Sequence, residues 1–402
     1  MQKLTSIPLK EAIESSLDLV DTKPLKEWVS ISIALGRVLA MDVICQKNLP
    51  SFNNSALDGY AIKAEDRGKK LYIKDTVFAG DNKDEDLGKD ECFKIMTGAK
   101  IPKSADTIVA FENARLLDDN FVQIPKDVKK GNAFRVKGEE LAVGETLFQE
   151  GRFIDSAVLA MLASQGISQI KVYKKITIGV FSTGDELKEP WEKANDDEIY
   201  NVNSSSLIAL FGEYGFDADY CGVIPDNLEE SKRYFAEMKK YDMLVTTGGI
   251  SMGEADFVED ALLHNGLKPL FHGVNIKPGR PTMIGKMDNT IVASMPGNPL
   301  AAYVNAFLVL VPLIKKLQGY RDFEHKILKA KMSKELKVKP NRTNLVLGSY
   351  EDGRFFVTGD NRYGSGMIMP MVQSNSLLVL SENIDFLKKD EEINLIVFKG
   401  TF

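Results

Sequence analysis

Between residues 175 and 320, apolar strand-like segments alternate with amphipathic helix-like segments, and this alternation constrains the fold more than any other feature. Strand character is found in ITIGVFST, ADYCGVI and MLVTTGG, and helix character is found in stretches such as LEESKRYFAEMKK between them. Parallel strands require crossover connections of this kind, and the crossover helices cover both faces of the sheet. The pattern therefore predicts a three-layer α/β domain with a mostly parallel sheet over residues 175–320.

Three further domains are predicted around this one, so that the whole chain is a multidomain α/β plus β protein. Residues 1–48 and 141–174 have mainly helical patterns and predict one helical or mixed N-terminal domain. Short alternating strands separated by turn residues over 49–140 predict a small β domain inserted into it. The same kind of pattern over 321–402 predicts an all-β C-terminal domain. Within the α/β domain, Asn203 is the predicted N-cap of the first helix.

The composition excludes several classes of protein. The 51 lysines and arginines and 57 aspartates and glutamates give a net charge of −6, which argues against a general nucleic-acid binder. No apolar signal segment is present near the N-terminus. The longest apolar run, Pro299 to Ile314, contains Asn305 and Pro312 and is shorter than the roughly 20 residues that span a bilayer. We predict a buried core helix there, and a cytoplasmic protein that does not bind membranes.

Few cysteines and histidines are available for chemistry. The chain has three of each, and they form no recognisable metal-binding or catalytic motif. We therefore expect the chemistry to depend on carboxylates, backbone amides and a few cations.

Two glycine-containing turns follow predicted strands and are candidates for binding a phosphate. A parallel α/β sheet binds ligands at the C-terminal ends of its strands, and the STGDEL turn there contains Thr183 and Gly184. The TTGGISMGEAD turn leads toward a helix N-terminus, where glycines let backbone N–H groups approach an anion. A plain strand-to-helix turn is the alternative, but so long a string favours a phosphate site. The candidate residues of the second turn are Gly248, Gly249, Ser251 and Gly253.

One acidic residue follows each of three predicted strands, namely Glu186, Asp226 and Asp256. A single residue of this kind often caps a helix or complements its dipole. Because the C-terminal ends of parallel strands meet at one edge, we expect the three carboxylates to converge beside the phosphate loop. Hard cations take oxygen ligands and bridge phosphates, so the three acids predict a Mg²⁺ site.

A cationic turn and a helix start are candidates for binding an oxyanion. The IKPGRP string contains Lys277 and Arg280 around a Pro-Gly turn. The SMPGNP string contains Pro296 and opens a helix with Asn298 as N-cap and Pro299 at the first helical position. Free amides at that helix start favour an anion, as do the two cations. A surface hairpin with solvated charges is the alternative; because both turns face the same sheet edge, we predict an anion pocket.

These strings resemble the molybdopterin molybdenumtransferase family, which includes the C-terminal part of gephyrin. The matching motifs run in the family's order and are NSALDGYA, IMTGAKIP, GEELAVGE, FSTGDEL, TTGGISMGEAD, IKPGRP and SMPGNP. The resemblance implies an enzyme that uses molybdate and a divalent cation to convert adenylated molybdopterin into molybdenum cofactor, with release of AMP. It also implies that Mg²⁺ and backbone amides neutralise the phosphoanhydride, while Lys277 and Arg280 hold molybdate.

The resemblance further implies an elongated homodimer, whose active cleft lies between the α/β domain of one subunit and the inserted β domain of the other. It allows a molybdopterin adenylyltransferase and molybdoenzyme maturation proteins as further partners. The residues that fall on the family's functional positions are Glu186, Asp226 and Asp256 as acids, Lys277, Arg280, Pro296 and Pro299 in the pocket turns, Asp58, Thr97 and Glu140 on the facing surface, and Ser365 in the C-terminal domain.

The sequence departs from the family pattern in several places. Glu140 stands where an aspartate is usual, and Asn201 replaces a common aspartate. Gly273 stands where many relatives carry a lysine. Asn344 replaces an arginine, with Arg342 close enough in the sequence to substitute for it. The loss of two cations should weaken anion binding, so a specialised or less active paralogue remains an alternative.

Two other functions and one other substrate fit parts of the sequence. An adenylyltransferase that makes the adenylated pterin has a similar α/β domain, but the NSALDGYA module and the C-terminal β domain belong to the insertion enzyme. A non-catalytic scaffold fits the architecture, as gephyrin shows, but an intact set of acids favours an enzyme. Tungstate has nearly the shape and charge of molybdate, so the residues leave the choice of oxyanion open.

Overall fold

The computed structural model describes residues 6–82, 85–224, 227–249 and 257–398. The chain divides into two compact units. Unit 1 consists of Met1–Ala40, Gly151–Asp155 and Gln169–Phe402, and unit 2 consists of Met41–Glu150 and Ser156–Ser168. The four-domain division stays a prediction, and its N-terminal domain, 1–48 and 141–174, has residues in both units.

A six-stranded sheet forms the centre of unit 1. Its strands, in spatial order, are β16 (Ala218–Ile224), β13 (Ile178–Thr183), β17 (Met243–Thr247), β21 (Thr290–Met295), β20 (Met283–Met287) and β18 (Leu267–His272). The first four run parallel, and β20 pairs antiparallel with both of its neighbours. The prediction of a mostly parallel sheet is confirmed.

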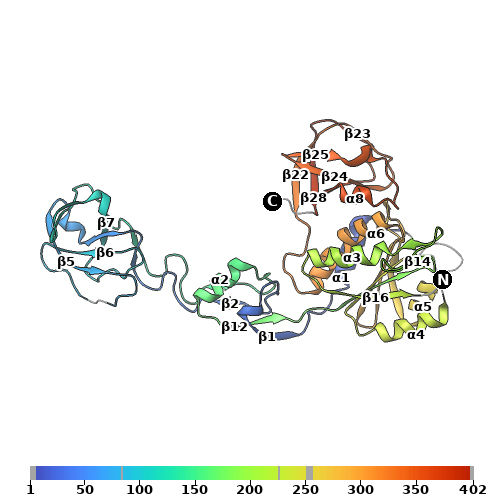
Figure 1. The fold of residues 1–402 in the computed structure, drawn as a ribbon, viewed down its shortest axis with the longest axis horizontal. Coiled ribbons are helices and arrows are strands. Elements are labelled where there is room, and N and C mark those ends of the chain that lie inside the picture. Colours follow the sequence, from blue (N-terminus) through green and yellow to red (C-terminus); the bar gives the residue numbers. More distant parts are fainter. Residues whose placement is uncertain (1–5, 83–84, 225–226, 250–256, 399–402) are drawn as a thin grey trace. The chain divides into compact units, whose positions relative to one another are not determined.

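Helices cover both faces of this sheet, because its strands are apolar on both sides. Along β17, Met243 and Val245 belong to one hydrophobic core, whereas Leu244 belongs to a second core on the other face. The first core includes residues of α1, α3, α6 and α7, and the second includes residues of α4 and α5 (Figure 1). The predicted three layers are therefore confirmed. These helices are α1 (Leu9–Asp18), α3 (Val202–Glu213), α4 (Leu228–Met238), α5 (Phe257–His264), α6 (Pro299–Asn305) and α7 (Val311–Leu317).

The helix that follows β21 is buried over most of its length. It begins at Pro299 behind the N-cap Asn298, as predicted, and it continues through a π-helical turn, Ala306–Leu310, to Leu317. By length and composition alone it could cross a membrane, but 83% of its apolar window is buried inside the protein. It is therefore a core helix of unit 1.

The C-terminal part of unit 1 is a closed β-sheet, which confirms the predicted β domain. Its strands are, in order, β24 (Thr343–Glu351), β25 (Arg354–Val357), β22 (Ile327–Met332), β28 (Glu392–Val397) and β26 (Ser376–Leu380), and β26 pairs back with β24. The short strand β19 (Ile276–Lys277) comes from the α/β part and pairs in parallel with β24. Smaller elements are β23 (Leu336–Lys337), β27 (Phe386–Leu387) and the one-turn helix α8 (Met369–Val372).

Unit 2 has its own six-stranded sheet, as expected for the inserted β domain. In spatial order the strands are β7 (Thr107–Ala110), β4 (Gly59–Ile62), β6 (Glu91–Ile95), β5 (Lys70–Val77), β9 (Phe121–Gln123) and β8 (Arg115–Asp118). Ala61 and Phe93 belong to one core, and Tyr60 and Cys92 belong to another, so both faces of the sheet are covered. The remaining elements are β2 (Val43–Ile44), β3 (Asn54–Ser55), β10 (Phe134–Arg135), β11 (Thr146–Phe148) and α2 (Ser156–Ser164).

Two local predictions are wrong. Beyond α1 the first 50 residues contain strands, because β1 (Lys26–Ser30) pairs with β12 (Gln169–Tyr173) and β2 pairs with β11. These partners lie far away in the sequence, and pairing of this kind overrides local helical propensity. The N-cap of α3 is Asn201 and not Asn203, since the Asn201 side chain accepts a hydrogen bond from the backbone N–H of Ser204.

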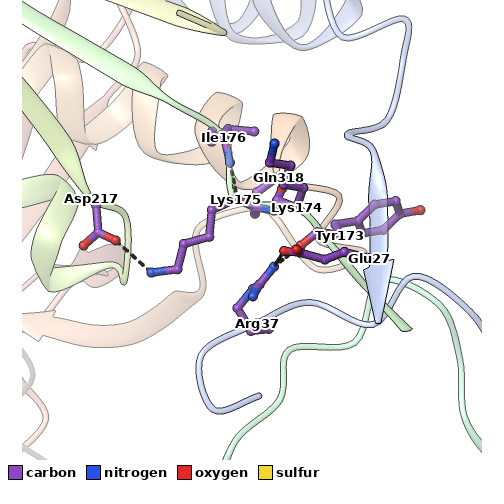
Figure 2. A network of polar contacts seen from close by, with 8 residues as sticks. All are labelled: Glu27, Arg37, Tyr173, Lys174, Lys175, Ile176, Asp217 and Gln318. Carbon is purple, nitrogen blue, oxygen red and sulfur yellow. Dashed lines mark hydrogen bonds and ion pairs between the residues drawn. The ribbon is translucent and has the colours of Figure 1, made fainter. Parts of the chain in front are cut away.

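A small polar network anchors the segment that leads into the α/β sheet (Figure 2). Gln318, after the end of α7, accepts a hydrogen bond from the Ile176 N–H at 3.0 Å and donates one to the Lys174 carbonyl at 3.1 Å. Lys175 pairs with Asp217 at 2.7 Å, at the sheet edge where the parallel strands begin. The network holds the connection between β12 and β13 within unit 1. Its further members are Glu27, Arg37 and Tyr173.

Candidate functional site

The C-terminal ends of four parallel strands meet at one edge of the α/β sheet. Thr183, the last residue of β13, lies opposite Ile224 of β16. Ser182 lies opposite Thr247 of β17, and Thr247 in turn lies opposite Met295 of β21. The turns that follow these strands therefore leave the sheet next to one another, at the edge where ligands bind in such folds.

Gly248 and Gly249 pack against the end of β13 and leave no room for side chains. Their φ angles are 82° and 64°, in the left-handed region that favours glycine. A Cβ on Gly248 would lie 2.9 Å from the Thr183 carbonyl oxygen, and one on Gly249 would lie 2.5 Å from a methyl group of Val258. The two glycines are only half-buried, so their backbone is accessible, as binding of a phosphate by N–H groups requires.

Glu186 is exposed beside the turn that follows β13. Its carboxylate oxygens lie 2.7 and 2.9 Å from the position that a Cβ would take on Gly184, whose φ is 134°. Glycine at this position therefore makes room for the carboxylate at the strand end. Among the described residues, no cation pairs with Glu186.

The other residues predicted for this edge are Asp226, Ser251, Gly253 and Asp256, and all four lie outside the described residues. Within the described ranges, no group of three or more histidine, cysteine, aspartate or glutamate residues could hold a metal ion. The Mg²⁺ site therefore stays a prediction, of which Glu186 is the described member.

A buried hydroxyl network lies beneath these turns and was not predicted from the sequence. Ser182 Oγ lies 2.8 Å from Asn201 Oδ1, 2.8 Å from Ser204 Oγ and 3.0 Å from Thr247 Oγ1. All four side chains are buried. Asn201 also donates to the Glu189 carboxylate at 3.2 Å, which an ionised aspartate at this position could not do. The only sequence signal is the presence of hydroxyl residues at the ends of apolar strands.

A cationic cavity of about 310 Å³ lies between the Lys277–Arg280 turn and the C-terminal sheet, both in unit 1. Lys277, Arg280 and Arg342 line it, and no carboxylate in the described part of the chain pairs with any of them. Arg280 donates a hydrogen bond to the hydroxyl of Ser6 at 3.0 Å. Three cations without acidic partners around one cavity favour an oxyanion there.

Asn298 connects this cavity to the strand-end turns. Its amide donates to the hydroxyl of Ser365 at 2.9 Å, and Ser365 lines the cavity. The preceding residue, Gly297, accepts a hydrogen bond from Asn203 at 2.8 Å, and a Cβ on Gly297 would lie 3.6 Å from the Cα of Gly248. The cavity and the glycine turn are thus connected through Gly297 and Asn298. The same turn contains the buried Pro296 and Pro299, the first residue of α6.

Two departures from the family pattern have a structural explanation. Gly273 does not line the cavity; its φ is 120°, and a Cβ there would lie 2.7 Å from the Ser6 hydroxyl. A lysine at this position would need strained backbone and a displaced Ser6. Asn344 is buried in the cavity wall and donates to the carbonyls of Lys339 and Arg342 at 2.9 and 3.0 Å. Arg342 lines the same cavity and supplies a cation that Asn344 lacks.

In unit 2 the structure brings two of the predicted site residues together. The Asp58 carboxylate accepts hydrogen bonds from the backbone N–H of Thr97 at 2.7 Å and from its hydroxyl at 2.8 Å. These bonds, the backbone one first, lower the pKa of the exposed Asp58 below its ordinary 3.8. Glu140 is exposed, and its backbone N–H donates to the Leu49 carbonyl at 2.9 Å.

We expect Thr97→Val to raise the pKa of Asp58 part of the way back toward 3.8, because the hydroxyl donor is lost and the backbone donor remains. Because the pKa of Asp58 is lower in the folded than in the unfolded state, its ionised carboxylate stabilises the fold at pH values above the unfolded pKa. This stabilisation is lost as the pH falls through the folded pKa. The measurement is an NMR titration of the Asp58 carboxyl carbon. Thr97→Ser keeps a hydroxyl and should leave the titration unchanged. Identical curves for the valine variant and the wild type would contradict the assignment.

Three family models match consecutive parts of the chain. The model of the MoeA N-terminal region (domains I and II) matches residues 7–166, that of a probable molybdopterin-binding domain matches 179–316, and that of the MoeA C-terminal region (domain IV) matches 329–398. Together they cover almost the whole chain, in the order that the motifs predict.

Relatives of the chain match it over nearly their full length. A molybdopterin molybdenumtransferase of Haemophilus influenzae is 31% identical over 98% of both chains. One of Staphylococcus epidermidis is 29% identical, over 94% of this chain and 93% of the relative. A crystal structure of the molybdopterin biosynthesis MoeA protein of Pyrococcus horikoshii is 27% identical, with a TM-score of 0.85 over 98% of this chain and 100% of that one.

Proposed function

The chain belongs to the molybdopterin molybdenumtransferase family, and on this premise we propose that it inserts molybdenum from molybdate into adenylated molybdopterin and releases AMP. Its full-length relatives carry the name of this activity, which is a step in molybdenum cofactor biosynthesis. The reaction needs a site for the diphosphate of the pterin nucleotide and, next to it, a site for a tetrahedral oxyanion.

One observation carries this proposal: the turn Gly297–Asn298 contacts both the accessible glycine turn and a residue that lines the cationic cavity. The Gly248–Gly249 backbone suits a phosphate, and the cavity suits molybdate. Asn298 and Gly297 link the two. Two reactants held side by side react as if within one molecule, which removes much of the entropic part of the barrier.

In the proposed reaction the chain's own residues bind and orient both substrates. Backbone amides of the half-buried turn after β17 hold the diphosphate. Thr183 and Gly184 are buried at the end of β13 and support that turn from beneath. Lys277, Arg280 and Arg342 hold molybdate near the anhydride. An oxygen of molybdate attacks the phosphorus on the pterin side of the anhydride and forms a P–O–Mo bond, while the anhydride bond breaks and AMP leaves with its electron pair. The two dithiolene thiols then bind molybdenum, the pterin phosphate is released from the metal, and one molybdate oxygen leaves as water with the two thiol protons.

The acids predicted for the sheet edge support Mg²⁺ as the cofactor. Glu186 fits such an ion, because its carboxylate is exposed, has no cationic partner among the described residues, and sits against Gly184 beside the phosphate turn. Glu186 would hold the ion together with Asp226 and Asp256. When bound, Mg²⁺ would supply positive charge that neutralises the phosphoanhydride.

We further propose a cytoplasmic homodimer, in which Asp58, Thr97 and Glu140 of the partner subunit complete each site. Family membership supports this arrangement. The Asp58 carboxylate is exposed and held by two hydrogen bonds from Thr97, which suits a residue that faces a cationic or hydrogen-bonding part of the substrate. Light scattering on the purified chain should give the mass of a dimer; a monomeric mass would refute the proposal.

The decisive assay supplies purified chain, whose dimer mass has been checked, with adenylated molybdopterin and molybdate, and measures AMP by chromatography. We expect AMP release that depends on molybdate and is abolished by EDTA and restored by Mg²⁺. A second reaction contains molybdopterin and ATP and should give no adenylated pterin. Tungstate replaces molybdate in a third reaction and reports the oxyanion preference.

The outcomes separate the competing functions. Turnover only with molybdopterin and ATP would show an adenylyltransferase, and no turnover in any reaction would show a non-catalytic scaffold. AMP release that is independent of the oxyanion would be hydrolysis, and it would refute insertion of molybdenum.

A further inference from the structure

The cation-bearing turn of the α/β part is held from beneath by a buried asparagine. Asn305 is fully buried in α6, yet its amide nitrogen donates to the Gly279 carbonyl at 2.7 Å and to the Thr282 hydroxyl at 2.7 Å. Thr282 also donates to Gly279, at 3.1 Å. The turn between Lys277 and Arg280 is therefore fixed through its central residue, Gly279.

The fit between this turn and Asn305 leaves no room for a side chain at Gly279. A Cβ on Gly279 would lie 2.4 and 2.5 Å from the two polar atoms of the Asn305 amide. Asn305 Oδ1 has no hydrogen-bond partner within the described residues, and burying an unpaired polar atom is costly. The π-helical turn begins at the next residue, Ala306, and turns of this kind are often found at functional sites. Burial of an unpaired amide oxygen in an otherwise apolar helix is unfavourable, and we infer that Asn305 has a role beyond packing.

The opposite wall of the cavity has a second buried asparagine. Asn344 is 5% exposed, and its amide donates to the carbonyls of Lys339 and Arg342. It thus holds the loop that carries the third cation, Arg342. Because Asn344 has no charge of its own, its contribution to the cavity is the position of its neighbour.

The two walls are joined to each other by strand pairing. In the β19–β24 pair, Lys277 lies opposite Asn344 and Ile276 lies opposite Thr343. The Thr343 N–H also donates to the Asn275 carbonyl at 3.0 Å. Fixing each loop to its own wall therefore fixes, relative to one another, the backbone positions from which the three cationic side chains extend.

We propose that Asn305 and Asn344 are positioning residues for the oxyanion: each holds one cation-bearing loop, so that Lys277, Arg280 and Arg342 face a single anion. The inference rests on the proposed function for the identity of the oxyanion. A fixed backbone removes the cost of ordering the two loops when the anion binds, and only the side chains then remain to be ordered. Loss of either asparagine should therefore weaken oxyanion binding, while the chemical step in the saturated enzyme is largely kept.

The test compares Asn305→Leu and Asn344→Leu with the wild type in full-length protein. Each variant should raise the KM for molybdate about tenfold or more, with kcat within about twofold. The rise in melting temperature on adding molybdate should shrink in parallel, because stabilisation follows the concentration of ligand relative to its Kd. This second readout needs no turnover.

Gln318→Leu is the matched control for a purely structural effect. Gln318 is also a buried amide that holds a backbone segment through two hydrogen bonds, as Figure 2 shows, and it lies about 20 Å from Asn305 along the helix axis. All three variants should lower the melting temperature, but only the two asparagine variants should change the KM for molybdate. Equal changes in KM for Gln318→Leu and Asn305→Leu would overturn the inference.

A variant that lacks the cationic side chains of Lys277 and Arg280 tests whether Asn305 acts through them. In Lys277→Ala/Arg280→Ala, adding Asn305→Leu should change molybdate-dependent stabilisation by less than about twofold, because the interaction it supports is gone. A fully additive effect would contradict positioning. A wild-type chain that is stabilised by molybdate but releases no AMP would refute the proposed function and leave the inference in place. A wild-type chain that molybdate does not stabilise would refute the inference.

Discussion

Replacing Glu186 by glutamine should lower molybdate-dependent AMP release by about two to three orders of magnitude, the size of effect seen when a preorganised charge-stabilising group is removed. Glutamine keeps the shape of the side chain beside Gly184 but removes the negative charge that would hold Mg²⁺. The loss should be greatest in single-turnover experiments with saturating substrate, since these measure the chemical step. Added Mg²⁺ should restore part of the activity, because weaker binding of the ion is the expected defect.

The matched control is Asp217→Asn, which removes a carboxylate at the opposite edge of the same sheet. Asp217 is exposed and pairs with Lys175 at 2.7 Å, where the parallel strands begin. Its replacement should leave AMP release within about twofold of the wild type, as is usual for surface changes away from a site. If Glu186→Gln behaved like Asp217→Asn, the assignment of Glu186 to the catalytic edge would be wrong.

The arrangement of the α/β sheet could be predicted because each of its strands carries its own signal. The apolar segments that end at Thr183, Thr247 and Met295 are bounded by helix-like stretches, and parallel topology then places their ends together. The pairing of β19 with β24 could not be predicted in this way. A two-residue strand has no periodicity, and its partner lies far along the sequence in the C-terminal β part. The strands β1 and β2 could not be predicted for a similar reason, since only distant partners define them.

The residues of the candidate site likewise fall into those that the sequence predicts and those that it does not. Glycines, acids and cations at strand ends can be recognised from the sequence, because their chemistry and their place after a strand both appear in it. The residues that support them cannot. Asn305 appears in the sequence only as an interruption of an apolar run, and its contact with Gly279 depends on how the helix packs. Ser182 and Asn344 likewise gain their roles from burial and neighbours that no local pattern reports.

Asn344 also shows why a residue-by-residue comparison can mislead. Read alone, the exchange of an arginine for this asparagine predicts a weaker anion site. In the structure Arg342 lines the cavity, and Asn344 holds its carbonyl in place. The charge of the cavity is thus kept by a pair of residues, and the pair is the unit that should be compared between relatives.

Replacing Gly248 by alanine should lower kcat/KM for adenylated molybdopterin by about 100-fold, the effect expected when a substrate is displaced by about an ångström. Its φ of 82° already disfavours alanine, and the new Cβ would lie 2.9 Å from the Thr183 carbonyl oxygen. That oxygen belongs to the backbone at the end of β13, so the turn itself must move.

Gly266→Ala separates the effect of backbone strain from the effect of the steric clash, because Gly266 has a φ of 93° but no atom within 4 Å of its Cβ position. The control should lose about 1 kcal/mol of unfolding free energy from backbone strain alone and keep its kinetics. Equal kcat/KM values in the two variants would mean that the Gly248 turn does not contact the substrate, and the phosphate site would then have to lie elsewhere.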